Sequence, residues 1–170
     1  MTLERLWAGW RSRYVSEEAG KLETCFLCAL AALPDDEVIS EGTLVLERTA
    51  TTLTVMNLYP YGSGHLLVAP RRHEAELGGL DEHEAQDLMA AQRRAVRAIG
   101  DAYDSDGINL GANLGRAAGA GLPDHLHFHA LPRWTGDTNF MTTVAEVRVL
   151  PEALDTGWAK LHKVWPAPQP

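Results

Sequence analysis

The stretch HLHFHALPRW, residues 125–134, places three of the chain's seven histidines at alternate positions. His125, His127 and His129 share one parity, and the residues between them are apolar. This two-residue period predicts a β-strand with its apolar side on a core and three imidazoles on the opposite face. Successive imidazoles start about 6.6 Å apart along such a strand. Side chains that titrate near neutral pH are therefore expected in one row.

Length and composition limit what kind of protein carries this row. A chain of 170 residues suits one domain with a sizeable core, and 45% hydrophobic with 22% charged residues is ordinary for a globular protein. The net charge of −8 argues against general nucleic-acid binding, which needs a basic face. No apolar run approaches the roughly 18 residues that span a membrane. The opening MTLERLWAGWRSRYV lacks the apolar stretch of a signal peptide, so a cytoplasmic location is predicted.

The remaining pattern predicts an α+β fold, with a mainly antiparallel sheet around one long helix. Apolar residues recur at helical spacing from Asp81 to Tyr103, and Asp81 or a residue beside it is expected to cap the start. Shorter helices are expected near the N-terminus (residues 3–15) and around residues 151–162. Besides the histidine stretch, the runs that favour strands are residues 43–48, 52–57, 65–70 and 107–115.

Cys25 and Cys28 are the only cysteines, and both lie in CFLCAL. One closely spaced pair in a cytosolic chain is more typical of a metal or redox site than of a structural disulfide. The alternative is a pair of reduced thiols in a helix. The spacing alone leaves these interpretations open.

Three interpretations of the histidine row compete. The histidines can be surface residues without a task, ligands that together bind one metal ion, or a site of covalent nucleotidyl transfer. The preceding NLGRAAGAG, residues 113–121, favours the third interpretation. Gly119 and Gly121 allow backbone N–H groups to approach an anion, and the loop leads directly to a candidate nucleophile.

Several motifs resemble those of the histidine triad (HIT) family of nucleotide hydrolases and transferases. HLHFHAL resembles the triad, MNLYPYGSGHLLVAPRRH the strand–turn–strand, INLGANLGRAAGAG the phosphate loop, and CFLCAL the Cys-x-x-Cys of zinc-containing members. LWAGWRSRYV and PRWTGDTNFM are most similar to the branch with actinobacterial diadenosine tetraphosphate phosphorylases. The resemblance implies a HIT-like fold with a five-stranded sheet. It places an N-terminal helical extension at 1–24, a HIT domain at 25–140 and a C-terminal extension at 141–170.

The resemblance also implies catalytic roles. His127, the central triad member, corresponds to the family's nucleophile, and its ring must be neutral to attack a phosphate. The other ring nitrogen is expected to donate to a fixed acceptor such as a backbone carbonyl. His129 is expected to hydrogen-bond the phosphate or the leaving oxygen. His65 matches the family histidine that contacts the phosphate chain.

The candidates for substrate binding follow from the same resemblance. Asn57 stands where many members carry an Asp that binds the ribose hydroxyls, and its carbonyl can still accept one hydrogen bond. Where others have Gln and Ser before the triad, this chain has Ala120 and Gly121. Only backbone N–H groups remain there, so Arg116 is an alternative contact to the leaving group. The full set of candidates is Asn57, Asn113, Arg116, Gly119 and Gly121.

For a metal, the resemblance nominates His73 and His125 together with Cys25 and Cys28. Such a Cys₂His₂ set makes a closed tetrahedral site for structural Zn²⁺. Binding of His125 to zinc would also fix the segment that carries His127.

The resulting hypothesis is a nucleotidyl hydrolase or phosphorylase that acts on dinucleoside polyphosphates or related adenylated nucleotides. Its reaction is expected to pass through a nucleotidyl-histidine. One alternative is an adenine-nucleotide binding or signalling module with weak hydrolysis, and another is a zinc enzyme that uses all three triad histidines as ligands. The expected partner is a nucleotide, with neither nucleic acid nor membrane. The resemblance implies a homodimer or a larger homo-oligomer.

Overall fold

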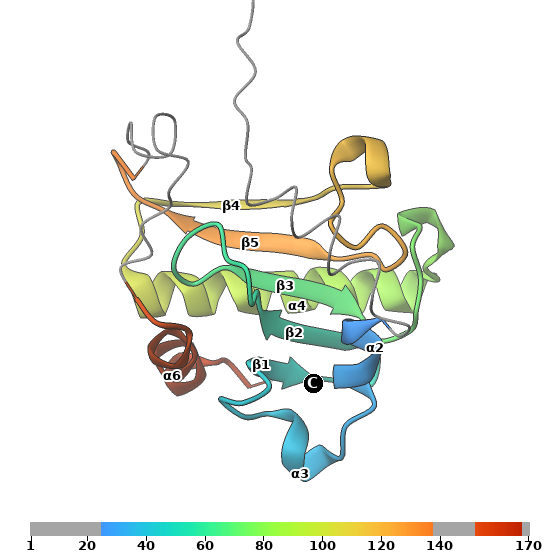
Figure 1. Ribbon diagram of the computed structural model, residues 1–170, viewed down its shortest axis with the longest axis horizontal. Coiled ribbons are helices and arrows are strands. Elements are labelled where there is room, and N and C mark those ends of the chain that lie inside the picture. Colours follow the sequence, from blue (N-terminus) through green and yellow to red (C-terminus); the bar gives the residue numbers. More distant parts are fainter. Residues whose placement is uncertain (1–24, 138–151, 168–170) are drawn as a thin grey trace, which may run out of the picture.

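The computed structural model describes residues 25–137 and 152–167. Five strands form one antiparallel sheet in the order β1–β2–β3–β5–β4 (Figure 1). The strands are β1 (Val45–Arg48), β2 (Thr52–Met56), β3 (Leu66–Pro70), β4 (Gly107–Ala112) and β5 (Phe128–Arg133). The helices are α2 (Phe26–Ala31), α3 (Asp35–Val38), α4 (Glu82–Tyr103) and α6 (Leu154–Val164), with 3₁₀ turns η2 (Leu77–Gly79) and η3 (Arg116–Ala118). The predicted α+β class and five-stranded sheet are confirmed.

The sheet has a core on each face because apolar residues on β3 point to both sides. Leu66 and Val68 are buried with Ala130 of β5 in the cluster beneath α4. Leu67, which has the opposite parity, lies in the second cluster with Leu27 of α2. Figure 1 shows α4 along the far side of the sheet and α2 on the near side. The α2 side is the face to which the histidines of the 125–129 stretch belong.

The long helix predicted from Asp81 to Tyr103 is confirmed as α4. Its start has a capping box, in which the Asp81 side chain accepts from the Glu84 N–H and the Glu84 side chain accepts from the Asp81 N–H. Asp104 ends the helix in the left-handed conformation, with φ of 45°. One buried ion pair ties the helix to the sheet, since Arg94 donates from Nε and Nη2 to the two carboxylate oxygens of Glu47 on β1, at 2.7 and 2.9 Å.

The strand predicted for the histidine stretch is right from residue 128 onward and wrong for residues 125–127. β5 begins at Phe128, where its pairing with both β3 and β4 also begins. Ahead of it, the Leu126 N–H donates to the Glu74 carbonyl at 2.6 Å, outside the sheet. Pro70 at the end of β3 has no N–H to continue the ladder. The first two histidines therefore precede the strand, although they remain on the predicted face.

The other elements differ from prediction mainly at their ends. The four remaining runs form β1 to β4 within the expected ranges, and the helix expected around residues 151–162 is α6, residues 154–164. The helix α2 resolves the ambiguous context of CFLCAL, and the short helix α3 was not predicted. The expected helix over residues 3–15 lies outside the described residues. None of the described helices combines the length and the apolar character needed to cross a membrane.

The turn between β2 and β3 is closed on itself and carries part of the site. The Asn57 N–H donates to the carbonyl of His65 at 2.9 Å, which joins the two ends of the turn. Gly64 has φ of +71°, a conformation that suits glycine. A Cβ on Gly64 would lie 2.5 Å from Cε2 of Tyr103. The turn thus needs glycine for two reasons, its backbone conformation and the ring against it.

Replacing Gly64 by Ala is expected to destabilise the protein by roughly 2–5 kcal/mol, from left-handed strain and overpacking together. The Tyr103 ring cannot easily give way because its hydroxyl donates to Glu152 at 2.8 Å. Gly62→Ala is the matched control, since its new Cβ would meet only Leu131 Cδ1 at 3.5 Å, an ordinary contact. Urea unfolding of both variants measures the difference, and equal stabilities would contradict this account of the turn.

Candidate active site and metal centre

His127 is held by its own backbone neighbour. Its Nδ1–H donates to the carbonyl of His125 at 2.8 Å, and the side chain is buried, with 6% exposed. Burial is the main cause that lowers the pKa of His127, so the neutral ring is favoured. With the proton on Nδ1, the lone pair lies on Nε2, where no described residue forms a hydrogen bond. This is the tautomer that a histidine nucleophile requires.

His65 and His129 form a directly bonded pair. His65 Nε2 and His129 Nδ1 are 2.9 Å apart. The Tyr61 N–H donates to Nδ1 of His65 at 3.0 Å, so that nitrogen is an acceptor. In a neutral His65 the proton is therefore on Nε2, which donates to Nδ1 of His129. A neutral His129 then carries its own proton on Nε2.

The three histidines of this group come together from separate elements. The rings of His127 and His129 have centroids 5.1 Å apart, and those of His65 and His129 are also 5.1 Å apart. His65 precedes β3, and the pairing of His129 with Leu67 places β5 beside that strand. The structure thus brings together the three residues predicted to be catalytic.

Asn57 lies in the same group, where its amide contacts the turn. Its Oδ1 accepts from the Tyr59 N–H at 3.0 Å, and its Nδ2 lies 3.3 Å from Nδ1 of His65. The carbonyl oxygen has a second lone pair that can accept from a ribose hydroxyl. The predicted ribose contact therefore remains a prediction.

The glycine-rich loop runs from β4 back to the histidines. Asn113 directly follows Ala112, which pairs with Phe128, so Asn113 enters the loop level with the start of β5. The Gly119 N–H donates within the loop to the Arg116 carbonyl at 3.0 Å, and Gly119 has φ of +86°. Its N–H is therefore already engaged.

Arg116 and Gly121 complete the predicted set in this loop. The Arg116 side chain is 81% exposed and lies 4.0 Å from Asp124, as a loose ion pair at the surface. A loose pair leaves the guanidinium able to turn toward an anion. The backbone at Gly121 is half-buried within the loop.

The four predicted metal ligands converge on one point. One ligand atom from each of Cys25, Cys28, His73 and His125 lies within 4.8 Å of the others. Nδ1 of His125 is 3.1 Å from the Cys25 sulfur, and Nδ1 of His73 is 3.3 Å from the Cys28 sulfur. A tetrahedral zinc site separates sulfur and nitrogen ligands by about 3.6 Å. The four side chains could thus bind one metal ion as a Cys₂His₂ ligand set with little movement.

Hydrogen bonding prepares His125 for this role. Its Nε2–H donates to the Pro70 carbonyl at 2.9 Å, which leaves the Nδ1 lone pair facing the two sulfurs. Burial, a hydrogen bond with Cys25 and repulsion from Cys25 raise the pKa of the Cys28 thiol to about 11. A bound cation would offset that repulsion.

A metal held by all three triad histidines is not the arrangement found. Nδ1 of His127 faces a carbonyl and Nδ1 of His129 faces His65, whereas only His125 faces the cysteines. Among the described residues, the one candidate group for a metal is the Cys₂His₂ set. The alternative of a three-histidine zinc enzyme is therefore wrong in its geometry.

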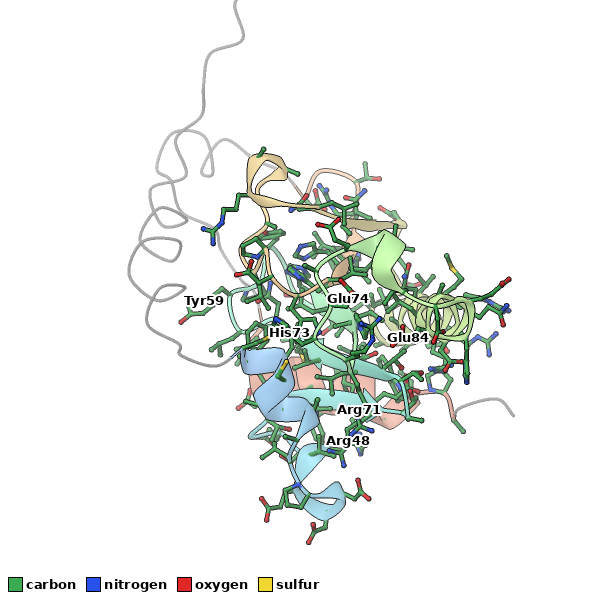
Figure 2. The ribbon with its side chains drawn as sticks, turned by 90° about the vertical axis from the view of Figure 1, so that its right-hand side faces the viewer. Arg48, Tyr59, Arg71, His73, Glu74 and Glu84 are labelled. Atoms are coloured by element: carbon green, nitrogen blue, oxygen red, sulfur yellow. The ribbon has the colours of Figure 1, made fainter. Side chains whose placement is uncertain are left out.

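His73 is carried by the loop from β3 to α4, which Arg72 braces. Arg72 donates to Glu74, to Glu84 and to the Gly79 carbonyl, at 2.8–2.9 Å. The hydrogen bond from Arg72, followed by that from the Asp81 N–H, lowers the pKa of Glu84 to about 2. Figure 2 shows His73 beside α2, with Glu74 and Glu84 in the adjoining part of this loop and helix.

Two arginines hold the other end of α2. Arg48 donates to the carbonyls of Ala31 and Leu33, and Arg71 also donates to Ala31 at 3.3 Å. Cations at a helix C-terminus satisfy its free carbonyls and suit its dipole. The helix that carries the cysteines is thus anchored to β1 and to the end of β3 (Figure 2).

His125 joins the metal centre to the histidine group. Its ring faces the cysteines, while its carbonyl accepts a hydrogen bond from the Nδ1–H of His127. Sequence reasoning anticipated that a metal would fix this segment. It missed the backbone N–H of Tyr61 and the carbonyls of Pro70 and Glu74, because backbone donors and acceptors at particular positions leave no pattern in a sequence.

Comparison with known proteins agrees with this geometry. The family model for the HIT domain matches residues 40–136. The AP-4-A phosphorylase of Mycobacterium tuberculosis is 40% identical over 155 residues, which cover 89% of this chain and 79% of that protein. The asymmetrical bis(5'-nucleosyl)-tetraphosphatase of Schizosaccharomyces pombe is 33% identical over 96 residues, or 56% of this chain and 52% of that protein.

A solved structure shows the same fold. A Zn-bound histidine triad family protein from Mycobacterium smegmatis has a TM-score of 0.62 and 25% identity, and the match covers 83% of this chain and 95% of that one. The family model and the phosphorylase each match more than half of the chain, and the solved structure has the same fold. The chain belongs to the HIT family and is an enzyme of its nucleotide hydrolase and transferase group.

Proposed function

We propose that this protein cleaves dinucleoside polyphosphates such as diadenosine tetraphosphate through a nucleotidyl-histidine, with phosphate as the acceptor. The observation that carries the proposal is the buried, neutral His127 with its Nδ1–H bound to the His125 carbonyl. The 40% identity to an AP-4-A phosphorylase over 89% of the chain supports the substrate class and the acceptor.

In the first step, Nε2 of His127 attacks the α-phosphorus. A P–N bond forms and the P–O bond to the rest of the polyphosphate breaks. The ring becomes positively charged, and the His125 carbonyl stabilises that charge through the Nδ1–H bond. From diadenosine tetraphosphate this step gives an adenylyl-histidine and ATP.

His129 donates a hydrogen bond from its Nε2–H to the departing oxygen, and keeps its proton. Its Nε2 carries a proton because Nδ1 accepts from His65. A departing phosphate oxygen is stabilised by a donor placed in advance. We assign His65 to the support of His129, in addition to its predicted contact with the phosphate chain.

In the second step, an oxygen of inorganic phosphate attacks the same phosphorus and the P–N bond breaks. Inorganic phosphate attacks through an unprotonated oxygen, so no proton has to move, and the electron pair of the broken P–N bond returns His127 to its neutral form. The product is ADP with phosphate as acceptor, or AMP with water. We assign Asn57 to the ribose, and Asn113, Arg116 and the backbone N–H of Gly121 to the phosphates, while the predicted contact of Gly119 would need its N–H to leave the Arg116 carbonyl.

The test is to incubate the purified protein with diadenosine tetraphosphate, with and without phosphate, and to identify the nucleotides by chromatography. We expect ADP and ATP in equal amounts with phosphate present, and little turnover without it. AMP plus ATP in both conditions would show asymmetric hydrolysis instead. Tight binding without turnover would replace the enzyme by a nucleotide-binding module.

We further propose that the Cys₂His₂ set holds structural Zn²⁺, which neutralises the two thiolates and fixes α2 to His125. Assembly into a homodimer or larger homo-oligomer is a proposal from the family resemblance. It suits β4, the edge strand of the sheet, where Leu110 is 45% exposed. Light scattering measures the mass in solution, and a monomer at all concentrations would contradict assembly. The cytoplasmic location and the absence of nucleic acid remain predictions.

A further inference from the structure

Tyr61 contacts both histidines of the bonded pair. It lies half-buried in the turn between β2 and β3, and its backbone N–H donates to Nδ1 of His65 at 3.0 Å. Its ring centroid is 4.7 Å from that of His65, at an interplanar angle of 34°. The same ring stacks on His129 at 5.6 Å and 29°. One residue thus binds one histidine by its backbone and covers both by its side chain.

The side-chain contact restrains a motion that the hydrogen bond leaves open. The bond from His65 fixes the direction of Nδ1 of His129 but permits the ring to tilt about the bond axis. Tyr61 restricts that tilt on one side, and the ring of His127 restricts it from another direction, at 5.1 Å and 76°. The aromatic cover also keeps water away from the bond between the two imidazoles, which strengthens it.

We propose that Tyr61 is a positioning residue, whose ring aligns His129 so that its Nε2–H meets the departing oxygen. The inference rests on the proposed function for the identity of that oxygen. The inferred orientation of His129 does not rest on the proposed function, because it can be measured without substrate. The backbone N–H does not depend on the side chain, so substitutions at position 61 test the ring alone.

In steady-state kinetics, Tyr61→Ala is expected to lower kcat by roughly ten- to a hundred-fold, with a smaller change in KM. This is part of the roughly 10²–10⁴-fold that a positioned donor contributes, because a tilted His129 still donates in some of its orientations. The loss should be largest with a dinucleoside polyphosphate and much smaller with a dinitrophenyl ester of AMP, because a dinitrophenol is far more acidic than the departing phosphate oxygen and leaves as an anion without a hydrogen bond. Tyr61→Phe is the matched control. It keeps the ring and should retain most of the activity on both substrates.

The structural readout is ¹⁵N NMR of the histidine side chains in the substrate-free protein. In wild type and Tyr61→Phe, the ring ¹⁵N signals of His129 should report one fixed ring orientation, whereas in Tyr61→Ala they should broaden because the ring tilts between orientations. Unchanged signals in Tyr61→Ala, or equal loss on both substrates, would overturn the proposal, as would Tyr61→Phe losing as much as Tyr61→Ala. If wild type turned over neither substrate, the proposed function would fail, while the NMR result would still decide the role of Tyr61.

Discussion

His127→Ala is expected to lower turnover of diadenosine tetraphosphate by on the order of 10⁴-fold or more, because it removes the attacking atom. The substituted protein should keep its fold, since the side chain makes one hydrogen bond, to a carbonyl that water can satisfy in its place. Kinetics measured by nucleotide chromatography, with circular dichroism for the fold, test both statements.

The covalent step has its own measurement. Substrate labelled with ³²P at the α-phosphate, followed by rapid acid-free denaturation, should leave label on wild-type protein at His127 and none on the variant. His83→Ala is the matched control, because that histidine is exposed on α4 and, within residues 25–137 and 152–167, pairs only with Asp87. Normal turnover by His127→Ala, or label found on another side chain, would contradict a covalent mechanism through His127.

Replacing Cys25 and Cys28 together by Ser is expected to abolish zinc binding and to lower stability by about 4 kcal/mol, the contribution of a ligand at a thousand times its Kd. For a chain of this size that corresponds to a fall in Tm of roughly 10 °C. The physical reason is that two of the four converging ligands are lost, while the buried His125 keeps its lone pair facing them. Metal analysis and thermal melts measure the two effects.

A milder variant tests the same site in case the double cysteine variant does not fold. His73→Asn removes an exposed ligand, so it should weaken metal affinity while the sheet persists. Activity should fall with metal content in this variant and return when zinc is added, because His125 positions the acceptor for His127. Stoichiometric zinc retained by the double cysteine variant would contradict the Cys₂His₂ site.

The fold could be predicted from the sequence where a hydrophobic pattern was bordered by a capping residue or a turn. Asp81 or a residue beside it was expected to cap the start of α4, and the apolar run between the glycine turn and Pro70 marked β3. The strand predicted for the histidine stretch was wrong at residues 125–127, because an alternating pattern does not reveal where a strand loses its pairing partners. That limit depends on Pro70 and on the Glu74 carbonyl, which lie far from the stretch in sequence.

The candidate site followed from the sequence only at the level of residue types. The triad and the resemblance nominated His65, His127 and His129, and the structure brings these three together. The resemblance implied a fixed acceptor such as a backbone carbonyl for His127, but not that Nδ1 would donate or that His125 would accept. The tautomers of His65 and His129 could not be predicted, since they depend on the Tyr61 N–H. Nor could the local bond that engages Gly119, because the backbone path of a glycine-rich loop is not encoded by side-chain pattern.

The contact between the Cys25 sulfur and His125 spans 100 residues of chain, and that between Cys28 and His73 spans 45. Closures of this length form late, because the entropy of long loops is lost before the contact stabilises anything. A newly made chain can therefore possess its hairpins and its long helix well before residue 127 is correctly aimed. Catalytic competence, on this view, marks the completion of folding rather than its onset.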